Sequence, residues 1–169
     1  MAITKLVSDS LGAGVGGKVL QVVTATKTDV FSVAGGTTFV DITGLSVSIT
    51  PSSASSKILV LIDVAIGTAA TSVYALRLLR NSTPIGGGTA RDSRQSASKA
   101  GGSVDANGQQ TSAFNYLDSP STTSATTYKV QLLGNDATCR INATQLDTNT
   151  NQSYGSTTSS TITAMEIAG

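Results

Sequence analysis

Apolar and hydroxyl side chains alternate with a period of two along much of this chain, and this alternation restricts it to β-structure. In residues 45–50, LSVSIT, every second residue is apolar and the residues between are Ser or Thr. Pro51 and the serines after it end this predicted strand, because proline has no N–H for a sheet. Residues 57–66, KILVLIDVAI, are apolar on both faces until Asp63. A strand of this kind is covered on both sides, by a neighbouring subunit or by a loop of its own chain.

Further strands are predicted by the same pattern at residues 18–26, 38–43, 73–80, 112–117, 127–133, 138–143 and 161–167. Clusters of Gly, Ser, Asn, Asp and Pro separate them, and the polar, glycine-rich residues 90–110 are expected to form one long exposed loop. About eight short strands at this spacing predict an all-β fold, an antiparallel and jelly-roll-like β-sandwich over residues 18–169. Residues 1–17 are interpreted as an arm with a glycine hinge.

The composition excludes several classes of function. The formal net charge is +1 and only 12% of residues are charged, so no basic field attracts nucleic acid or an acidic membrane. Neither a signal peptide nor a membrane-spanning segment is recognisable, so we expect no membrane insertion and a protein made in a cytoplasm. The absence of histidine excludes Ser-His and Cys-His nucleophile pairs, and the lone Cys139 cannot form an internal disulfide.

Two motifs resemble ligand sites but lack essential parts. Residues 12–19, GAGVGGKV, follow a phosphate-loop spacing, yet Val19 replaces the Mg²⁺-binding Ser or Thr and a predicted strand follows instead of a helix. Asp147 begins a sequence like a calcium loop, but its sixth position is Gln152 and its twelfth is Thr158. Glu166 is the only glutamate, which gives no carboxylate pair that the sequence can place across a sugar. We therefore predict no enzymatic activity, no catalytic residues, no cofactor and no metal.

Basic residues concentrate in one part of the chain. Four of the five arginines lie within 18 residues: Arg77, Arg80, Arg91 and Arg94. One interpretation is a set of surface or intersubunit ion pairs, with Asp63 and Asp92 as partners. The other is contact with an anionic partner, such as lipopolysaccharide phosphate or an acidic capsid patch. For that second case the candidate partner-contact residues are Arg91, Arg94 and Lys99.

Several phrases of the sequence resemble a known family. The segments GKVLQVVTATKTDVFSV, TTFVDITGLSVSITPSSASSKILVLIDV, FNYLDSPSTTSATTYKVQL and STITAMEIAG are similar to small virion proteins of tailed bacteriophages, common in aquatic phages and usually described as tail-fibre or structural proteins. The opening MAITKLVSDSLGAGVGGK is also similar to the starts of such proteins. The resemblance implies a non-enzymatic β-sandwich homotrimer, assembled in the cytoplasm of the host bacterium and located in the virion.

Two positions in a virion are compatible with this resemblance. In the first, the protein is a tail-fibre or adhesin component that contacts the host surface, including its polysaccharide. In the second, it is a capsid decoration protein that cements the major capsid lattice. In either case the partners are other virion proteins and further copies of the chain. The candidate anchoring residues in the arm are Ile3, Lys5, Leu6, Val7 and Leu11. The candidate subunit interface consists of Leu59 and Leu61, with Ser46 and Ser48 expected to face solvent.

Overall fold

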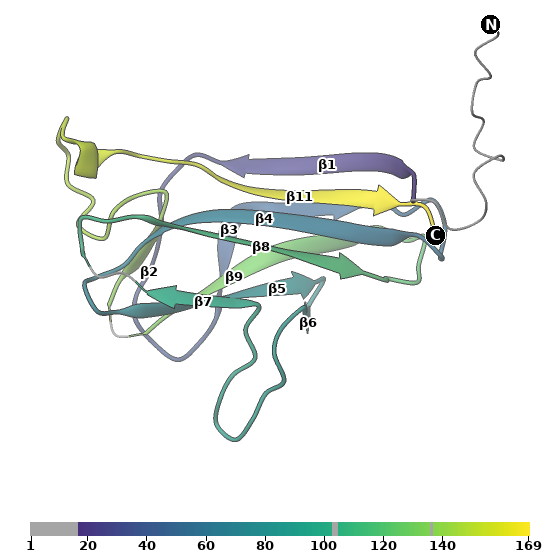
Figure 1. Ribbon diagram of the computed structural model, residues 1–169, viewed down its shortest axis with the longest axis horizontal. Helices are drawn as coiled ribbons and strands as arrows, with labels where there is room; N and C mark the ends of the chain where they lie inside the picture. Colours follow the sequence, from purple (N-terminus) through teal and green to yellow (C-terminus); the bar gives the residue numbers. More distant parts are fainter. Residues whose placement is uncertain (1–16, 103–104, 136) are drawn as a thin grey trace, which may run out of the picture.

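Two antiparallel sheets pack face to face in the computed structural model, which describes residues 17–102, 105–135 and 137–169 (Figure 1). The predicted all-β antiparallel sandwich is therefore confirmed. We name the layer that holds the first and last strands sheet I, and the other layer sheet II. Within the described residues, the one regular element that is not a strand is a 3-10 turn at Ser153–Gly155.

Sheet I has six strands in the described part of the chain: β1 (Val19–Lys27), β2 (Phe31–Val33), β4 (Lys57–Gly67), β8 (Gln110–Asp118), β10 (Cys139–Ile141) and β11 (Ser160–Ile167). Sheet II has five: β3 (Val40–Ile49), β5 (Val73–Arg80), β6 (Thr83–Ile85), β7 (Lys99–Gly102) and β9 (Thr126–Gly134).

The strand order is that of a jelly roll. Strand β1 pairs with β11, β3 with β9, β4 with β8, and β5 with both β6 and β7. Strands β1, β3, β4 and β5 thus form one arm of a long folded hairpin, and the strands that follow form the other arm. Pairing of β11 with β4 and of β9 with β5 closes the roll. Sheet I therefore reads β1-β11-β4-β8 along its main strands, and sheet II reads β3-β9-β5 followed by β6 and β7. Consequently β1 and the β6–β7 region lie at opposite edges of the sandwich, because β1 contacts β3 and β7 contacts β8.

The period-two alternation of the sequence becomes the core. On β4 the inward residues Ile58, Val60, Ile62 and Val64 are buried, as predicted. They pack against the buried alternate residues of sheet II, among them Leu76, Leu78, Tyr128, Val130 and Leu132. Ser46 and Ser48 are exposed on the outer face of β3, also as predicted. Burial of these apolar side chains is the main favourable contribution to folding, at about 25 cal/mol per Å².

Three short strands lie outside the strands that the sequence predicts. Strand β2 follows β1 closely, β6 lies in a segment predicted as loop, and β7 lies within the predicted loop 90–110, so that prediction is wrong for residues 99–102. Each is only three or four residues long, which is too short to show a period. The predicted strands 38–43 and 45–50 are one strand, β3, since Gly44 has a φ of +85° at the register shift between Asp41 and Ser46 and so accommodates a bulge.

A buried polar network joins four separate parts of sheet I around Asn142. The Asn142 Nδ2 group donates to the carbonyl oxygens of Lys27 at 2.9 Å and Asp29 at 3.0 Å. Its Oδ1 accepts from the Ser160 hydroxyl at 2.6 Å, and that hydroxyl oxygen accepts from the Ala65 N–H at 3.0 Å. Both Asn142 and Ser160 are fully buried. The network therefore satisfies backbone groups where β1, β4, β10 and β11 approach one another.

Glu166 has a structural role on the inner side of β11. Its side chain is fully buried and accepts hydrogen bonds from Gln21 Nε2 at 2.6 Å, and from the Ser52 N–H and hydroxyl at 2.7 Å each. Hydrogen bonds from Gln21 and Ser52 lower the pKa of Glu166 from 4.5 to about 2. The carboxylate thus attaches the turn after β3 to the paired strands β1 and β11.

This arrangement predicts a loss of stability in acid. Because the pKa of Glu166 is lower in the folded state, the carboxylate adds to the free energy of unfolding above pH 4.5. This stabilisation is lost as the pH falls toward about 2. Urea unfolding across this window should show the free energy of unfolding of the wild type falling more steeply than that of Glu166→Gln. Asp92→Asn, at an exposed position, is the control and should follow the wild type. Equal slopes for wild type and Glu166→Gln would contradict the assigned role.

Candidate partner-contact site

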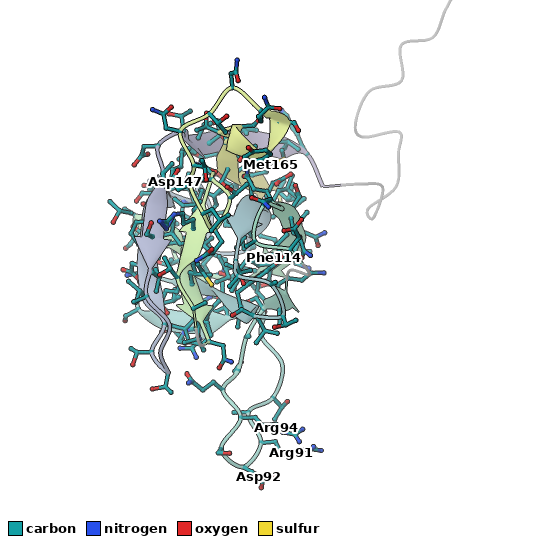
Figure 2. All side chains as sticks on the ribbon, turned by 90° about the vertical axis from the view of Figure 1, so that its left-hand side faces the viewer. Arg91, Asp92, Arg94, Phe114, Asp147 and Met165 are labelled. Atoms are coloured by element: carbon teal, nitrogen blue, oxygen red, sulfur yellow. The ribbon has the colours of Figure 1, made fainter. Side chains whose placement is uncertain are left out.

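The loop that connects β6 to β7, residues 86–98, projects from the sandwich (Figure 1). Arg91, Asp92 and Arg94 lie at its tip (Figure 2). The Arg94 N–H donates to the Arg91 carbonyl at 2.9 Å, and Asp92 adopts a φ of +54° within this tight turn. The side chains of Arg91 and Asp92 are 69% and 85% exposed. The tip thus presents two guanidinium groups to solvent.

Hydrogen bonds hold the base of this loop to β5. The Ser98 hydroxyl accepts from the Leu78 N–H at 3.0 Å and donates to the Ile85 carbonyl at 3.2 Å. The Ser98 N–H donates to the Leu76 carbonyl at 2.8 Å, and the Gly88 N–H donates to the Ala97 carbonyl at 3.2 Å. Because these bonds use backbone groups on both arms of the loop, the tip stands on a fixed stem.

Arg77 braces one side of the loop against sheet II. Its guanidinium lies 3.7 Å from the centroid of the Phe39 ring, and its Nε donates to the Ser96 carbonyl at 3.2 Å. Gln95 extends the brace by donating to the Thr37 carbonyl at 2.8 Å. Desolvation by burial lowers the pKa of Arg77 from its usual value. Arg77 therefore positions the loop, and it does not form part of the exposed tip.

Arg80 is also separate from the tip. Its Nη1 lies 3.0 Å from both carboxylate oxygens of Asp118, and the Tyr128 hydroxyl donates to Asp118 Oδ2 at 2.7 Å. These three side chains join β5 and β9 of sheet II to β8 of sheet I. Arg80 therefore does form an ion pair, but within the chain and with the buried Asp118, instead of the predicted surface or intersubunit pair with Asp63 or Asp92. Of the predicted pairs, Arg91 approaches Asp92 at 3.9 Å.

The structure separates the remaining predicted site residues. Lys99 is exposed on β7 at the base of the loop, so it lies apart from Arg91 and Arg94 in the tip. Leu59 is half-buried and Leu61 is 37% exposed, and both lie on the outer face of sheet I. The arm residues Ile3, Lys5, Leu6, Val7 and Leu11 lie outside the described residues.

The brace of the loop was not predictable from the sequence. Phe39 reads as an ordinary strand residue, and nothing local to it indicates a contact with Arg77, 38 positions away. The same holds for Ser98, whose hydroxyl looks like any other in a polar, glycine-rich stretch. The only available signal was the concentration of arginines.

The two motifs rejected on sequence have other local structures where they are described. Residues 19–27, which follow the glycine-rich motif, form strand β1, and residues 12–16 of the motif lie outside the described residues. Asp147 has its carboxylate 3.6 Å from the Arg140 guanidinium. Among the described residues there is no group of three or more His, Cys, Asp or Glu side chains that could hold a metal ion. The described residues also contain no helix that is long and apolar enough to cross a membrane.

Comparisons with known proteins yield structural likenesses only. No protein family matches the chain, and no curated protein matches its sequence. Its fold is similar to a chain in the structure of infectious bursal disease virus strain Gt, at 15% identity and a TM-score of 0.48 over 91% of this chain and 39% of that one. It is also similar to a chain in T=1 particles derived from infectious bursal virus, at 14% identity and a TM-score of 0.47 over 88% of this chain and 36% of that one. The chain therefore spans less than two fifths of the length of these viral chains.

Proposed function

We propose that this chain is a non-enzymatic structural protein on the exterior of a tailed bacteriophage virion, where it acts as a tail-fibre or adhesin component. The sequence resemblance points to a phage virion protein. A jelly roll is an architecture of viral capsid and lectin domains, so the fold is compatible with this role without defining it. The contacting surface is the tip of the loop 86–98, with Arg91 and Arg94 directed at anionic groups of the host surface, such as lipopolysaccharide phosphate.

The observation that carries this proposal is the position of the loop. It projects from the edge of sheet II that lies opposite β1, the strand by which the chain enters the sandwich (Figure 1). A protein attached near its first strand would therefore present the loop away from the attachment point. The stem bonded to β5 and the brace at Arg77 hold the tip in place, so less conformational entropy is lost on contact.

Gold-labelled antibody against the protein, applied to intact virions and viewed by electron microscopy, tests the location. Gold at the tail or its fibres is the expected result. Gold distributed over the head would replace the adhesin with a capsid decoration protein. Particles that contain no copy of the protein would overturn the virion role altogether.

Charge reversal at the tip tests the contact. We expect Arg94→Glu to weaken binding of the purified protein to lipopolysaccharide vesicles about tenfold, because a charge-assisted contact is replaced by repulsion. The control is Lys18→Glu, which makes the same change of charge at an exposed residue beside β1. Binding should also weaken as salt is raised, since exposed charges are screened. Equal effects of the two variants would show that net charge, and not the loop, determines binding.

A further inference from the structure

The outer face of sheet I carries a row of large apolar side chains that crosses four strands. The register of the strands places Val22 of β1 opposite Met165 of β11, Met165 opposite Leu59 of β4, and Leu59 opposite Leu117 of β8. Val22 is 54% exposed and Leu117 is 49% exposed. We call these four side chains the ridge. No described residue covers the exposed parts of Val22 and Leu117, so the ridge lacks a partner within the described part of the chain.

Beside the ridge the same face is hollowed. Two residues further along each strand, the next outward-facing side chains form the row Thr24, Thr163, Leu61 and Asn115. The row after that is Thr26, Thr161, Asp63 and Ala113. A shallow depression of about 420 Å³ lies here, lined in part by Leu61, Asp63, Ala113 and the two threonines of β11. The face thus combines a ridge of large apolar side chains with an adjacent hollow whose outward lining is smaller or polar except for Leu61.

Two outward residues of β4 carry opposite charges, Lys57 at its start and Asp63 past its middle. Lys57 precedes the ridge and Asp63 borders the hollow, with Leu59 and Leu61 between them. Both charged residues are exposed, and neither forms an ion pair with any described residue. They are six residues apart on one strand, about 20 Å at 3.3 Å per residue, which prevents them from pairing with each other.

We propose that this face binds the same face of a second copy of the chain. The two copies are related by a two-fold axis that lies between their facing sheets I and runs perpendicular to β4. The axis reverses the strand direction, so the ridge of each copy packs against the hollow of its partner. Leu59 then faces the Leu61 position of the other copy. Lys57 lies within reach of the Asp63 position of the other copy, which gives two equivalent ion pairs. An isologous contact requires such a self-complementary surface.

The charges select this arrangement over the other face-to-face option. A two-fold axis parallel to β4 would place Lys57 over Lys57 and Asp63 over Asp63, and would stack ridge on ridge. Like charges in direct opposition are unfavourable, and large side chains opposite each other leave the hollow empty. The perpendicular axis avoids both problems.

The size of the face predicts a weak dimer. Four strands spaced about 4.8 Å apart and seven residues long cover roughly 19 by 23 Å, or about 900 Å² in total for the two copies. Stable complexes usually bury about 1,600 Å², so we expect reversible association that depends on concentration. In a virion, where copies are held close together, such a contact would be occupied. The inference does not depend on the tail or head location proposed above.

Sedimentation equilibrium of the full chain, from micromolar to millimolar concentration, tests the proposal. We expect the mass to rise from 17.0 kDa toward twice that value. Leu59→Asp should abolish association, whereas Ser46→Asp, an equivalent change on the exposed outer face of sheet II, should not. Thermal unfolding of both variants checks that they fold.

A charge exchange between copies makes the test specific. Lys57→Asp and Asp63→Lys should each weaken the dimer about tenfold, and the double variant should recover most of the loss because the ion pairs form again in the opposite sense. Recovery cannot arise within one chain, since the two positions are too far apart. A protein that stays monomeric at millimolar concentration, a dimer without recovery in the double variant, or a trimer insensitive to Leu59→Asp would each overturn the proposal. The last result would favour the trimer that the family resemblance implies.

Discussion

Replacing Asn142 by Ala is expected to lower the free energy of unfolding by about 4 kcal/mol, among the largest effects of any single substitution in this chain. The change removes the donor to the Lys27 and Asp29 carbonyls and the acceptor for the Ser160 hydroxyl, all in a fully buried site. Unsatisfied buried polar groups cost about 1–3 kcal/mol each, which sets the magnitude. Asn142 also has a φ of +66°, where alanine is strained. In a domain of this size the midpoint of thermal unfolding should fall by roughly 10 °C.

Two companion variants separate the causes. Asn142→Gly removes the same hydrogen bonds but tolerates the positive φ, so it should be about 1 kcal/mol less damaging than Asn142→Ala. Asn151→Ala, at an exposed position in the following loop, should leave stability within about 0.5 kcal/mol of the wild type. Chemical denaturation at pH 7 gives all three values. A loss below about 1 kcal/mol for Asn142→Ala would mean that water or a rearranged side chain satisfies the network.

Replacing Asp118 by Ala is expected to cost about 3 kcal/mol in free energy of unfolding, because it removes the carboxylate that both Arg80 and Tyr128 use. Arg80 loses the carboxylate that it contacts at 3.0 Å, and the fully buried Tyr128 loses the acceptor for its hydroxyl. The value is at the lower end of the range for buried pairs, since the Arg80 side chain is 30% exposed and can be solvated by water. The substitution also cuts a link between the two sheets. Urea unfolding should therefore show a lower midpoint with an unchanged slope.

The matched variant is Tyr128→Phe, which keeps the Arg80–Asp118 pair and should cost about 1 kcal/mol. The stability of this variant should also differ from that of the wild type at high pH. Desolvation and the bond to Asp118 raise the pKa of Tyr128 above its usual value of 10.0. A raised pKa contributes stability below pH 10 that is lost as the pH rises further, so the wild type should lose stability in alkali more steeply than Tyr128→Phe. Equal costs for Asp118→Ala and Tyr128→Phe would show that the ion pair contributes nothing.

Local patterns predicted the long strands, because alternation along one strand already reveals which face is buried. The inward residues Ile58, Val60, Ile62 and Val64 of β4 are the clearest case. Short strands such as β2, β6 and β7 carry no such pattern. Strands β6 and β7 pair with the longer strand β5, and β2 pairs with the equally short β10, so each depends on a partner strand. The predicted loop 90–110 therefore contains strand β7, while Arg91 and Arg94 lie in an exposed loop as predicted.

Sequence alone could not rank the polar residues. Asn142 and Asn151 occur in similar Asn-x-Thr and Asn-x-Ser triplets, yet one is at the centre of a buried network and the other is exposed. Arg80 and Arg91 carry the same charge, but Arg80 forms an ion pair that connects the two sheets and Arg91 faces solvent. The difference lies in partners far along the chain, such as Asp118 for Arg80.

By itself the sequence determined the fold class, since a period of two over most of the chain leaves β-structure as the way to bury its apolar residues. It also ruled out histidine-based chemistry through composition. The tertiary structure alone decided which strands are neighbours. That decision placed the loop 86–98 at the edge opposite β1, aligned the ridge across four strands, and left Lys57 and Asp63 without an ion-pair partner among the described residues. The reason is physical: alternation is a local property of one strand, whereas register and strand order depend on contacts between residues that are distant in sequence.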